Sequence, residues 1–231
     1  SRVVGGTGVQ PGAWPGIVSI QATWKNGTWH MCSGVLLSFQ WVLTVAHCFI
    51  RAGPWLCSLS PLSPSGTSNG GAATNLSELG PGAMVHPIKR ILIHQHYRAG
   101  SERNNIALLE LDQPVECSDY IQLGCVPDTS VRVSDLKSCY IAGWSFATPG
   151  ALGPNVVLQE AKVHLMDTRL CNSSRWYGGA VHPENLGAGL ICKDKRADYF
   201  WLVGLSSWGR GCDKARHPGI YTSTQHFYNW I

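Results

Sequence analysis

The chain has 231 residues, of which only 14% are charged, and its formal net charge is +4. A chain of this length can bury a substantial core, either as one large domain or as two packed halves. Its apolar runs are shorter than the roughly 18 to 20 residues of a transmembrane helix, and no charged-then-apolar leader begins it. We therefore expect no transmembrane segment and a sequence that starts after any signal peptide. No basic stripe is interleaved with aromatic residues, which excludes nucleic acid as a serious partner.

Nine cysteines are the strongest signal in the composition. In a reducing cytosol so many would normally hold metal, but the sequence has no pair of CxxC motifs, so disulfides formed in the secretory pathway are the better interpretation. Three sequons, beginning at Asn26, Asn75 and Asn172, agree with that compartment. The sequence therefore predicts a disulfide-bonded, N-glycosylated protein, and we assign it no cofactor and no metal.

The first half is expected to consist of short strands separated by turns. Strands and tight turns are expected over 1–57. Residues 58–82 are expected to form a long loop or disordered insert, because from residue 60 onward this segment has no Val, Ile, Phe, Tyr or Trp. Strands resume at Ile88 and continue through Leu109, and a linker-like region follows over 116–134.

The second half contains four further strand-like runs, over 139–143, 156–165, 190–192 and 200–208. A short helix is expected over 167–177, with Asp167 or Thr168 as its N-cap, because both side chains accept hydrogen bonds from the first N–H groups of a helix. No repeat of fixed period occurs. The pattern as a whole predicts an all-β protein.

Three short motifs stand out in the first fifty residues: Arg2-Val-Val-Gly-Gly6, Cys32-Ser-Gly-Val35 and Leu43-Thr-Val-Ala-His-Cys48. They resemble the corresponding stretches of the trypsin-like serine endopeptidases, and among these the acrosin type of the sperm acrosome. Further matching stretches extend the resemblance to the C-terminal Ile231. They include Ser207-Trp208-Gly209, which matches the remnant of a strand that pairs with the substrate backbone, an edge to which a peptide can add.

The resemblance implies one trypsin-like domain over 3–231, built from two packed six-stranded antiparallel β-barrels. The first barrel is expected at about 16–115 and the second at about 130–231. We expect the second barrel, and the 58–82 region of the first, to be eroded, because both lack sequence that the family uses for strands and loops.

The resemblance also assigns the remnant of a Ser-His-Asp catalytic triad. His47 matches the general base, which takes the proton of the attacking serine. The aspartate that would orient this histidine is replaced by Asn105. An amide can present its NH2 group to the ring and stabilise the wrong tautomer, and in the reference triad of this family that exchange lowers kcat by about 10⁴. Asn104 gives no rescue, and Glu102 or Asp112 would need a different register.

The nucleophile has no counterpart in the sequence. The family carries it in a Gly-Asp-Ser-Gly-Gly motif, which occurs nowhere in the chain, and only residues 188–191 separate Gly187 from Cys192. This shortening removes the nucleophile, the oxyanion N–H groups, the specificity acid and the partner of a new N-terminus together. Loss of the nucleophile alone typically lowers kcat by about 10⁶. Ser33, which precedes a glycine, is interpreted as a structural serine rather than a substitute nucleophile.

The cysteines are assigned by the same resemblance. It pairs Cys32 with Cys48 and Cys139 with Cys192. Two more, Cys117 and Cys125, match the positions that link the heavy chain of acrosin to its light chain, so a disulfide-linked light chain is the expected partner. Three cysteines are left without an assigned partner: Cys57, Cys171 and Cys212. Gly187 stands where the family has one of the missing cysteines.

A possible metal pair is set aside. His94 and His96 would share one face of a strand, but zinc needs further ligands, and we interpret them as surface histidines.

Three hypotheses remain. The first is an inactive acrosin-like homologue, extracellular or in the acrosomal vesicle, that binds the egg coat or sulfated glycans in fertilisation. The second is an active trypsin-like endopeptidase, cleaving after Arg or Lys, whose serine segment is missing through splicing or an imperfect gene model. The third is a decaying product without a stable fold. A missing segment would not explain Asn105 or the composition of 58–82, so the sequence favours the first.

Overall fold

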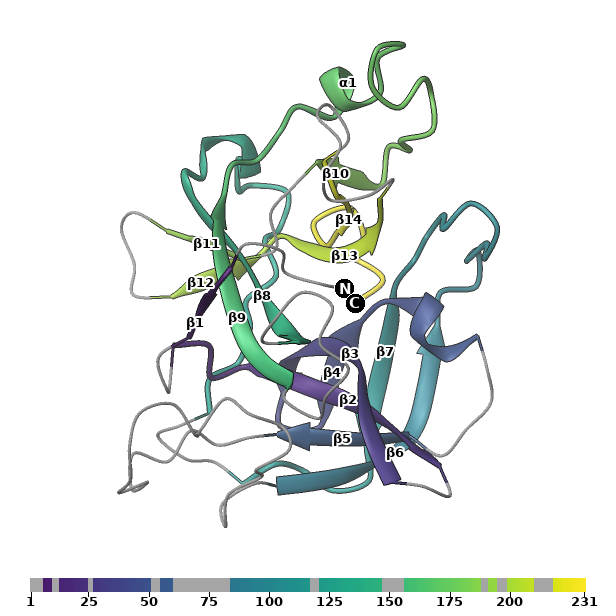
Figure 1. Ribbon diagram of the computed structural model, residues 1–231, viewed down its shortest axis with the longest axis vertical. Helices are drawn as coiled ribbons and strands as arrows, with labels where there is room; N and C mark the ends of the chain where they lie inside the picture. Colours follow the sequence, from purple (N-terminus) through teal and green to yellow (C-terminus); the bar gives the residue numbers. More distant parts are fainter. Residues whose placement is uncertain are drawn as a thin grey trace.

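The computed structural model describes residues 6–9, 13–24, 27–50, 55–59, 84–116, 121–146, 156–187, 191–194, 199–209 and 218–231. Nearly every regular element in these residues is a β-strand, and the only α-helix among them is one turn long (Figure 1). The expected all-β class is therefore confirmed.

The first half forms a closed barrel of six strands in the order β2-β3-β4-β7-β6-β5. Every neighbouring pair in it is antiparallel. The strands are β2 (Ile17–Trp24), β3 (Gly27–Ser38), β4 (Trp41–Thr44), β5 (Trp55–Leu59), β6 (Met84–Ile93) and β7 (Ala107–Leu111).

The barrel closes in spite of the poor composition expected to erode it. β5 runs to Leu59, so its last two residues belong to the barrel rather than to the insert expected from residue 58. β5 then pairs directly with β6, from Leu56 opposite Pro87 to Leu59 opposite Met84. Residues 60–83 lie outside the described residues. The six strands needed for closure are present without them.

Apolar side chains on the inner face hold this barrel together. Its largest fully buried side chains come from β2, β3, β4 and β7, which are rich in the branched residues that pack well on pleated surfaces: Val18, Ile20, Leu36, Val42, Leu43, Leu109 and Leu111. β4 pairs with β7 from Trp41 opposite Glu110 to Thr44 opposite Ala107. The end of β4 and the start of β7 therefore lie side by side, which positions the residues that follow and precede them.

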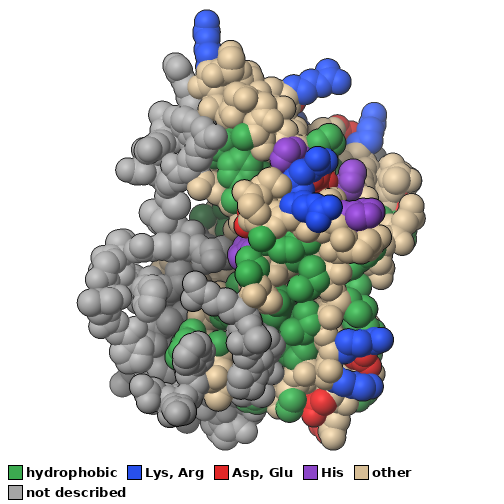
Figure 2. Space-filling view, turned by 90° about the vertical axis from the view of Figure 1, so that its right-hand side faces the viewer, with side chains coloured by type: hydrophobic (Ala, Val, Ile, Leu, Met, Phe, Trp, Pro, Cys, Tyr) green, Lys and Arg blue, Asp and Glu red, His purple; other side chains and the backbone are tan. Residues whose placement is uncertain are grey.

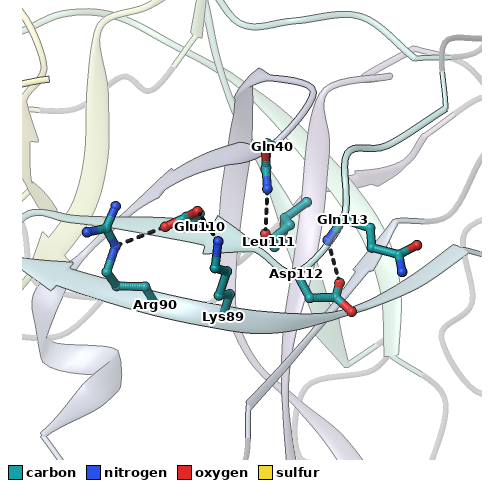
Figure 3. A network of polar contacts seen from close by, with 7 residues as sticks. All are labelled: Gln40, Lys89, Arg90, Glu110, Leu111, Asp112 and Gln113. Atoms are coloured by element: carbon teal, nitrogen blue, oxygen red, sulfur yellow. Dashed lines mark hydrogen bonds and ion pairs between the residues drawn. The ribbon is translucent and has the colours of Figure 1, made fainter.

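The outer surface of the barrel carries a small polar network (Figure 3). Glu110 on β7 accepts from Lys89 and Arg90 on β6, each at 2.9 Å. Nearby, Gln40 donates to the carbonyl of Leu111 at 3.1 Å. Exposed ion pairs of this kind add little to stability, because water already solvates the charges and long side chains lose freedom in pairing.

Outside the barrel, the described strands of the second half, joined by β1 from the N-terminal segment, form two separate sheets rather than one closed barrel, which agrees with the expected erosion. A five-stranded sheet has the order β1-β9-β8-β11-β12, and a three-stranded sheet has the order β10-β14-β13. The strands are β1 (Thr7–Gly8), β8 (Ser138–Phe146), β9 (Val156–Val163), β10 (Asn185–Gly187), β11 (Ile191–Lys193), β12 (Phe200–Leu202), β13 (Gly204–Trp208) and β14 (Ile220–Ser223).

The expected helix is shorter than predicted. α1 covers only Thr168–Cys171, and the chain continues in turns up to Tyr177. Asp167 is its N-cap, as predicted, and its carboxylate accepts from the backbone N–H of Arg169 at 2.7 Å. The helix stops after one turn because Asn172 accepts from Val181 and Gly179, which draws the chain back on itself. Tertiary contacts thus override the local helical preference.

Both assigned disulfides are present. Cys32–Cys48 ties β3 to a 3₁₀ helix after β4, and Cys139–Cys192 joins directly opposed residues of β8 and β11. Of the other cysteines, Cys125 and the buried Cys171 have free thiols. Cys57 lies in β5, while Cys117 and Cys212 lie outside the described residues.

Candidate functional site

The candidate site is assembled where β4 ends and β7 begins. His47 lies in the 3₁₀ helix η1 (Ala46–Phe49), which follows β4 and is anchored by the Cys32–Cys48 disulfide. Asn105 lies two residues before β7 and is completely buried. The antiparallel pairing of the two strands brings these residues together across 58 positions of sequence.

The orientation of the Asn105 amide follows from its partners. Oδ1 lies 2.9 Å from the backbone nitrogen of His47, which can only donate a hydrogen bond, so the amide atom facing it must be the oxygen. The amide nitrogen Nδ2 therefore faces the ring and lies 2.8 Å from Nδ1 of His47. Because Nδ2 can only donate, Nδ1 accepts, and the neutral ring carries its hydrogen on Nε2.

The surroundings also favour the neutral ring. Burial lowers the pKa of His47 below its ordinary value of 6.5, because desolvation penalises the imidazolium. Asn105 adds no negative charge that would stabilise the charged form. In water near neutral pH, His47 is thus an uncharged ring whose Nε2–H is a hydrogen-bond donor.

Two further hydrogen bonds fix Asn105 from the second half of the molecule. Its side-chain Nδ2 donates to Oγ of Ser207 at 2.9 Å. Its backbone carbonyl accepts from Oγ1 of Thr222 on β14 at 2.9 Å. Ser207 reaches the amide because β13 has a bulge between Ser206 and Trp208, which turns the intervening side chain out of the regular alternation. The sequence had assigned Ser207 to a substrate-pairing strand but gave no sign of this contact or of Thr222.

No described carboxylate replaces the missing aspartate at the ring. Glu102 accepts from the hydroxyl of Tyr97 at 2.9 Å instead. Asp112 follows β7 at its opposite end and accepts from the backbone of Gln113. Asn104 donates to the carbonyl of His96. The ring of His47 therefore has Asn105 as its polar neighbour within the part of the chain that the structure describes.

The stretch from Glu184 to Asp194, where the resemblance expects a nucleophile loop, contains two short strands. β10 pairs with β14, and β11 pairs with β8 and β12. Residues 188–190 between them lie outside the described residues. A Cβ atom added to Gly187 would lie 2.6 Å from Sγ of Cys171. The position at which the resemblance expects a cysteine is thus directly opposite the free thiol of Cys171.

Ser33 does not form a Ser-His pair with His47. Both residues line one pocket between the barrel and the second half, but the Oγ atom of Ser33 is buried without a hydrogen-bond partner. A base in the observed tautomer could not accept its proton through Nε2. Its assignment as a structural serine remains a prediction, which this geometry supports.

The strand of Ser207, Trp208 and Gly209 lies at the edge of a sheet. β13 pairs with β14 on one side and with no other strand among the described residues. Trp208 packs against Tyr177 with ring centroids 5.0 Å apart, and Gly209 is exposed. An extended peptide could add to this edge through backbone hydrogen bonds.

The remaining candidate residues have varied positions. Asn172, half-buried, caps the end of α1, and Asn26 and Asn75 lie outside the described residues, so glycosylation at all three remains a prediction. His94 uses Nδ1 to accept from the backbone of His96 at 3.2 Å. Among the described residues, one group of side chains of the kinds that bind metals lies close together: Cys32, His47 and Cys48. Both sulfurs are in a disulfide and cannot act as thiolates.

The comparisons with known proteins identify the family of the chain. A family model described as Trypsin matches residues 3–231. The chain belongs to the trypsin family. This trypsin-family chain is 34% identical over 247 residues to human Transmembrane protease serine 5 and 30% identical over 246 residues to human Transmembrane protease serine 11B. It is 29% identical over 249 residues to mouse Transmembrane protease serine 11C.

Each alignment covers all of this chain but only 51%, 55% and 53%, respectively, of the relative. The chain thus spans about half the length of these curated relatives. Within the described residues, no helix is both long and apolar enough to cross a membrane. Membership of the trypsin family confirms the broader part of the sequence-based assignment, and the acrosin type remains a separate prediction.

Proposed function

We propose that this trypsin-family chain is a catalytically inactive, acrosin-like serine protease homologue that acts by binding. The observation that carries the proposal is the orientation of the Asn105 amide, whose nitrogen donates to Nδ1 of His47. The relatives are named as proteases, so homology alone would lead us to expect hydrolysis. The geometry at His47 and the absence of a Gly-Asp-Ser-Gly-Gly motif both oppose it.

Catalysis by the triad requires a lone pair on Nε2 of the histidine, because that atom takes the serine proton. In the tautomer that Asn105 stabilises, Nε2 carries the hydrogen and its lone pair is absent. The imidazolium that would form during the reaction also lacks a carboxylate to stabilise it. The chain therefore lacks both a nucleophile and a competent base, and restoring one of them does not restore the other.

Hydrolysis of benzoyl-arginine ethyl ester and labelling by a fluorophosphonate probe test this part of the proposal. We expect neither reaction from the purified chain, nor from the Asn105→Asp variant, because the nucleophile is still missing. Trypsin serves as the positive control. Turnover or stoichiometric labelling of the chain as written would refute inactivity.

The competing hypothesis of a missing segment has its own test. Sequencing the transcript across Asn185 to Cys192 would reveal an in-frame Gly-Asp-Ser-Gly-Gly segment if splicing or gene prediction had removed it. Even then, a protein retaining Asn105 is expected to be slower than its Asn105→Asp counterpart by about 10⁴ in kcat.

The proposed binding role is supported by a surface where cationic and histidine side chains gather. Figure 2 shows Lys, Arg and His side chains close together on the upper part of one face, above a hydrophobic area. In the loop between β6 and β7, Arg98 and Arg103 pair through their backbones, and the rings of His94 and His96 lie 5.6 Å apart. His226 interacts electrostatically with His94. Sulfated glycans, including those of the egg coat, offer the anionic groups that such a surface attracts.

Retention on a heparin column tests this role. Arg98 is exposed, so Arg98→Glu should elute at lower salt than the unmodified chain, whereas the charge-matched control Lys162→Glu on the exposed side of β9 should shift elution less. No retention at low salt, where electrostatic attraction is strongest, would exclude glycan binding.

The proposal also includes a light chain, joined by disulfides through Cys117 and Cys125, in an extracellular or acrosomal setting. Cys125 is half-buried with a free thiol, and its carbonyl accepts from Leu202, so it lies at a defined place beside β12. A light-chain peptide co-expressed with the chain should co-migrate without reductant and separate with it. Replacement of both cysteines by serine should abolish the linked form.

A further inference from the structure

A cysteine, a histidine and an aspartate lie on three neighbouring strands of the barrel. Cys57 belongs to β5, His86 belongs to β6, and Asp112 directly follows β7. The strand order β7-β6-β5 places β6 between the other two. None of the three residues contributes to the site around His47, and Cys57 is one of the cysteines to which the resemblance assigns no partner.

The pairing of the strands brings these residues together. Cys57 stands directly opposite His86 in the antiparallel register of β5 with β6. Residues opposed in this way form the cross-strand pairs of a sheet, with Cβ atoms about 4.5 to 5.5 Å apart. On the other side of β6, the backbone N–H of Asp112 donates to the carbonyl of Pro87 at 3.0 Å. His86 is thus flanked by a cysteine on one neighbouring strand and by an aspartate on the other.

The two ring nitrogens of His86 have different surroundings. Nδ1 lies 3.8 Å from Oδ1 of Asp112, which is within ion-pair distance but too long for a hydrogen bond. Nε2 is buried and has no hydrogen-bond partner among the described residues. An unpartnered buried nitrogen is unfavourable, because it has lost its hydrogen bonds to water. The residue opposite His86 is a cysteine, a residue type whose thiol can donate a hydrogen bond.

A thiol, an imidazole and a carboxylate in this order are the components of an activated nucleophile. The neutral imidazole accepts the thiol proton, and the carboxylate then stabilises the imidazolium. An isolated thiol, with a pKa of about 8.5, is only about 1% thiolate at pH 6.5. The group lies at the boundary with solvent, because 37% of the Asp112 side chain and 14% of the His86 side chain are exposed.

We propose that Cys57 is a reactive thiol, which His86 and Asp112 activate for exchange with small disulfides. In this step the thiolate sulfur attacks one sulfur of the disulfide, and a new S–S bond forms while the old one breaks. His86 first holds the thiol proton and then returns it to the departing thiolate. The product is a mixed disulfide, which is a reversible modification. This site goes beyond the proposed function, because it requires neither His47 nor the glycan-binding surface.

Labelling with hydroxyethyl disulfide at pH 6.5 tests the proposal. Peptide mapping by mass spectrometry follows the mixed disulfide at Cys57, with the half-buried thiol of Cys125 as an internal reference. Labelling of Cys57 should be at least about tenfold faster in the native chain than in His86→Gln, which cannot take up the thiol proton. Equal rates, or a Cys57 that is not labelled at all, would overturn the proposal.

The pH dependence separates activation from a structural effect of the substitution. At pH 9.5 the native chain and His86→Gln should be labelled at similar rates, because an ordinary thiol is then mostly thiolate without the help of a base. An unchanged rate at Cys125 in the variant verifies that its fold is intact. A difference at Cys57 that is as large at pH 9.5 as at pH 6.5 would contradict activation by the imidazole.

Two further variants assign the remaining roles. Asp112→Asn should give a rate between those of the native chain and His86→Gln, because the base remains but its carboxylate is lost. His164→Gln, which replaces an exposed histidine directly after β9, is the matched control and should leave labelling of Cys57 unchanged. A native rate in Asp112→Asn would remove Asp112 from the site, and a slower rate in His164→Gln would remove the specificity for His86.

Discussion

At the scale of single residues, the buried Asn105 contacts His47 through both polar atoms of its amide. Its oxygen accepts from the backbone N–H of His47, and its nitrogen donates to Nδ1 of the ring. Ser207 and Thr222 complete the hydrogen bonds of this buried residue. These hydrogen bonds fix the orientation of the Asn105 amide and thereby the tautomer of the His47 ring.

Replacement of Asn105 by Asp should raise the pKa of His47. Burial holds this pKa below its ordinary value, and a carboxylate in direct contact typically raises the pKa of a histidine by about 1 to 3 pH units. The measurement is NMR titration of the imidazole signals in both proteins. An Asn105→Asp variant whose His47 titrates as before would show that the amide is not bonded to the ring.

His30 makes a second prediction at this scale. Its Nδ1 bonds to Oγ of Ser19 at 2.8 Å, its Nε2 is buried without a partner among the described residues, and burial lowers its pKa to about 4. In the unfolded chain, His30 takes up a proton as the pH falls below its ordinary pKa of 6.5. In the folded chain it stays neutral until about pH 4. Stability should therefore fall as the pH decreases through this window, by up to about 3 kcal/mol.

Urea unfolding of the native chain and of His30→Gln at several pH values measures this effect. The native chain should lose more stability than the variant between pH 6.5 and 4.5, because the variant has no proton to take up on unfolding. Parallel pH dependences in the two proteins would assign the loss to other groups.

At the scale of elements, α1 and β10 meet at the free thiol of Cys171. The thiol of Cys171 is fully buried and lies against Gly187 of β10, and Oγ1 of Thr168 in α1 donates to the carbonyl of Asn185 in β10 at 3.4 Å. The pair packs in a small cluster with Tyr177, Val181 and Ile220, separate from the main core. Few apolar contacts hold this part of the molecule in place.

Gly187→Cys should form a disulfide with Cys171 and stabilise the protein by about 3 kcal/mol, as expected for a closed loop of this length. Thiol alkylation with mass spectrometry detects the bond, and thermal unfolding measures the gain. Gly187→Ala is the control and should destabilise, because its methyl group would meet the sulfur at 2.6 Å without bonding to it. If both Cys171 and the introduced cysteine remained free thiols in the Gly187→Cys variant, the predicted geometry would be wrong.

The sequence predicted elements well where their stabilisation is local and poorly where it is not. Short apolar runs separated by turn clusters indicated strands over 1–57 and from Ile88 to Leu109, and Asp167 was one of the two residues predicted to begin α1. The end of α1 depends on Asn172 contacting Val181, and the contact of Ser207 with Asn105 depends on a bulge in β13. Neither follows from local pattern, because both depend on residues brought together by the fold.

At the scale of the whole molecule, the two halves differ in whether their sheets have unpaired edges. The barrel has no free edges, whereas the two other described sheets are open and end at β1 and β12 and at β10 and β13. Links between the halves include a hydrogen bond from Trp14 to Glu160 at 2.6 Å and an ion pair of Arg103 with the buried Glu184 at 3.3 Å. The second half thus has fewer partners for its backbone and depends on these links.

Hydrogen exchange should show this difference directly. Backbone amides of β3, β4 and β7 should exchange only through global unfolding, while those of β10, β13 and β14 should open at a free energy lower by several kcal/mol. Mass spectrometry of peptides from the two halves measures both rates. Equal protection would indicate one cooperative unit and would contradict the expected weakness of the second half.

The free thiol of Cys171 connects this imbalance to biosynthesis. Once buried, the thiol reacts slowly, because burial raises its pKa and depletes the thiolate. Before the second half has packed, the same thiol is an ordinary nucleophile in the oxidising pathway that the disulfides imply, so packing and thiol-disulfide exchange compete in time. The yield of correctly formed protein is then governed by the rate at which the weaker half folds, rather than by its final stability.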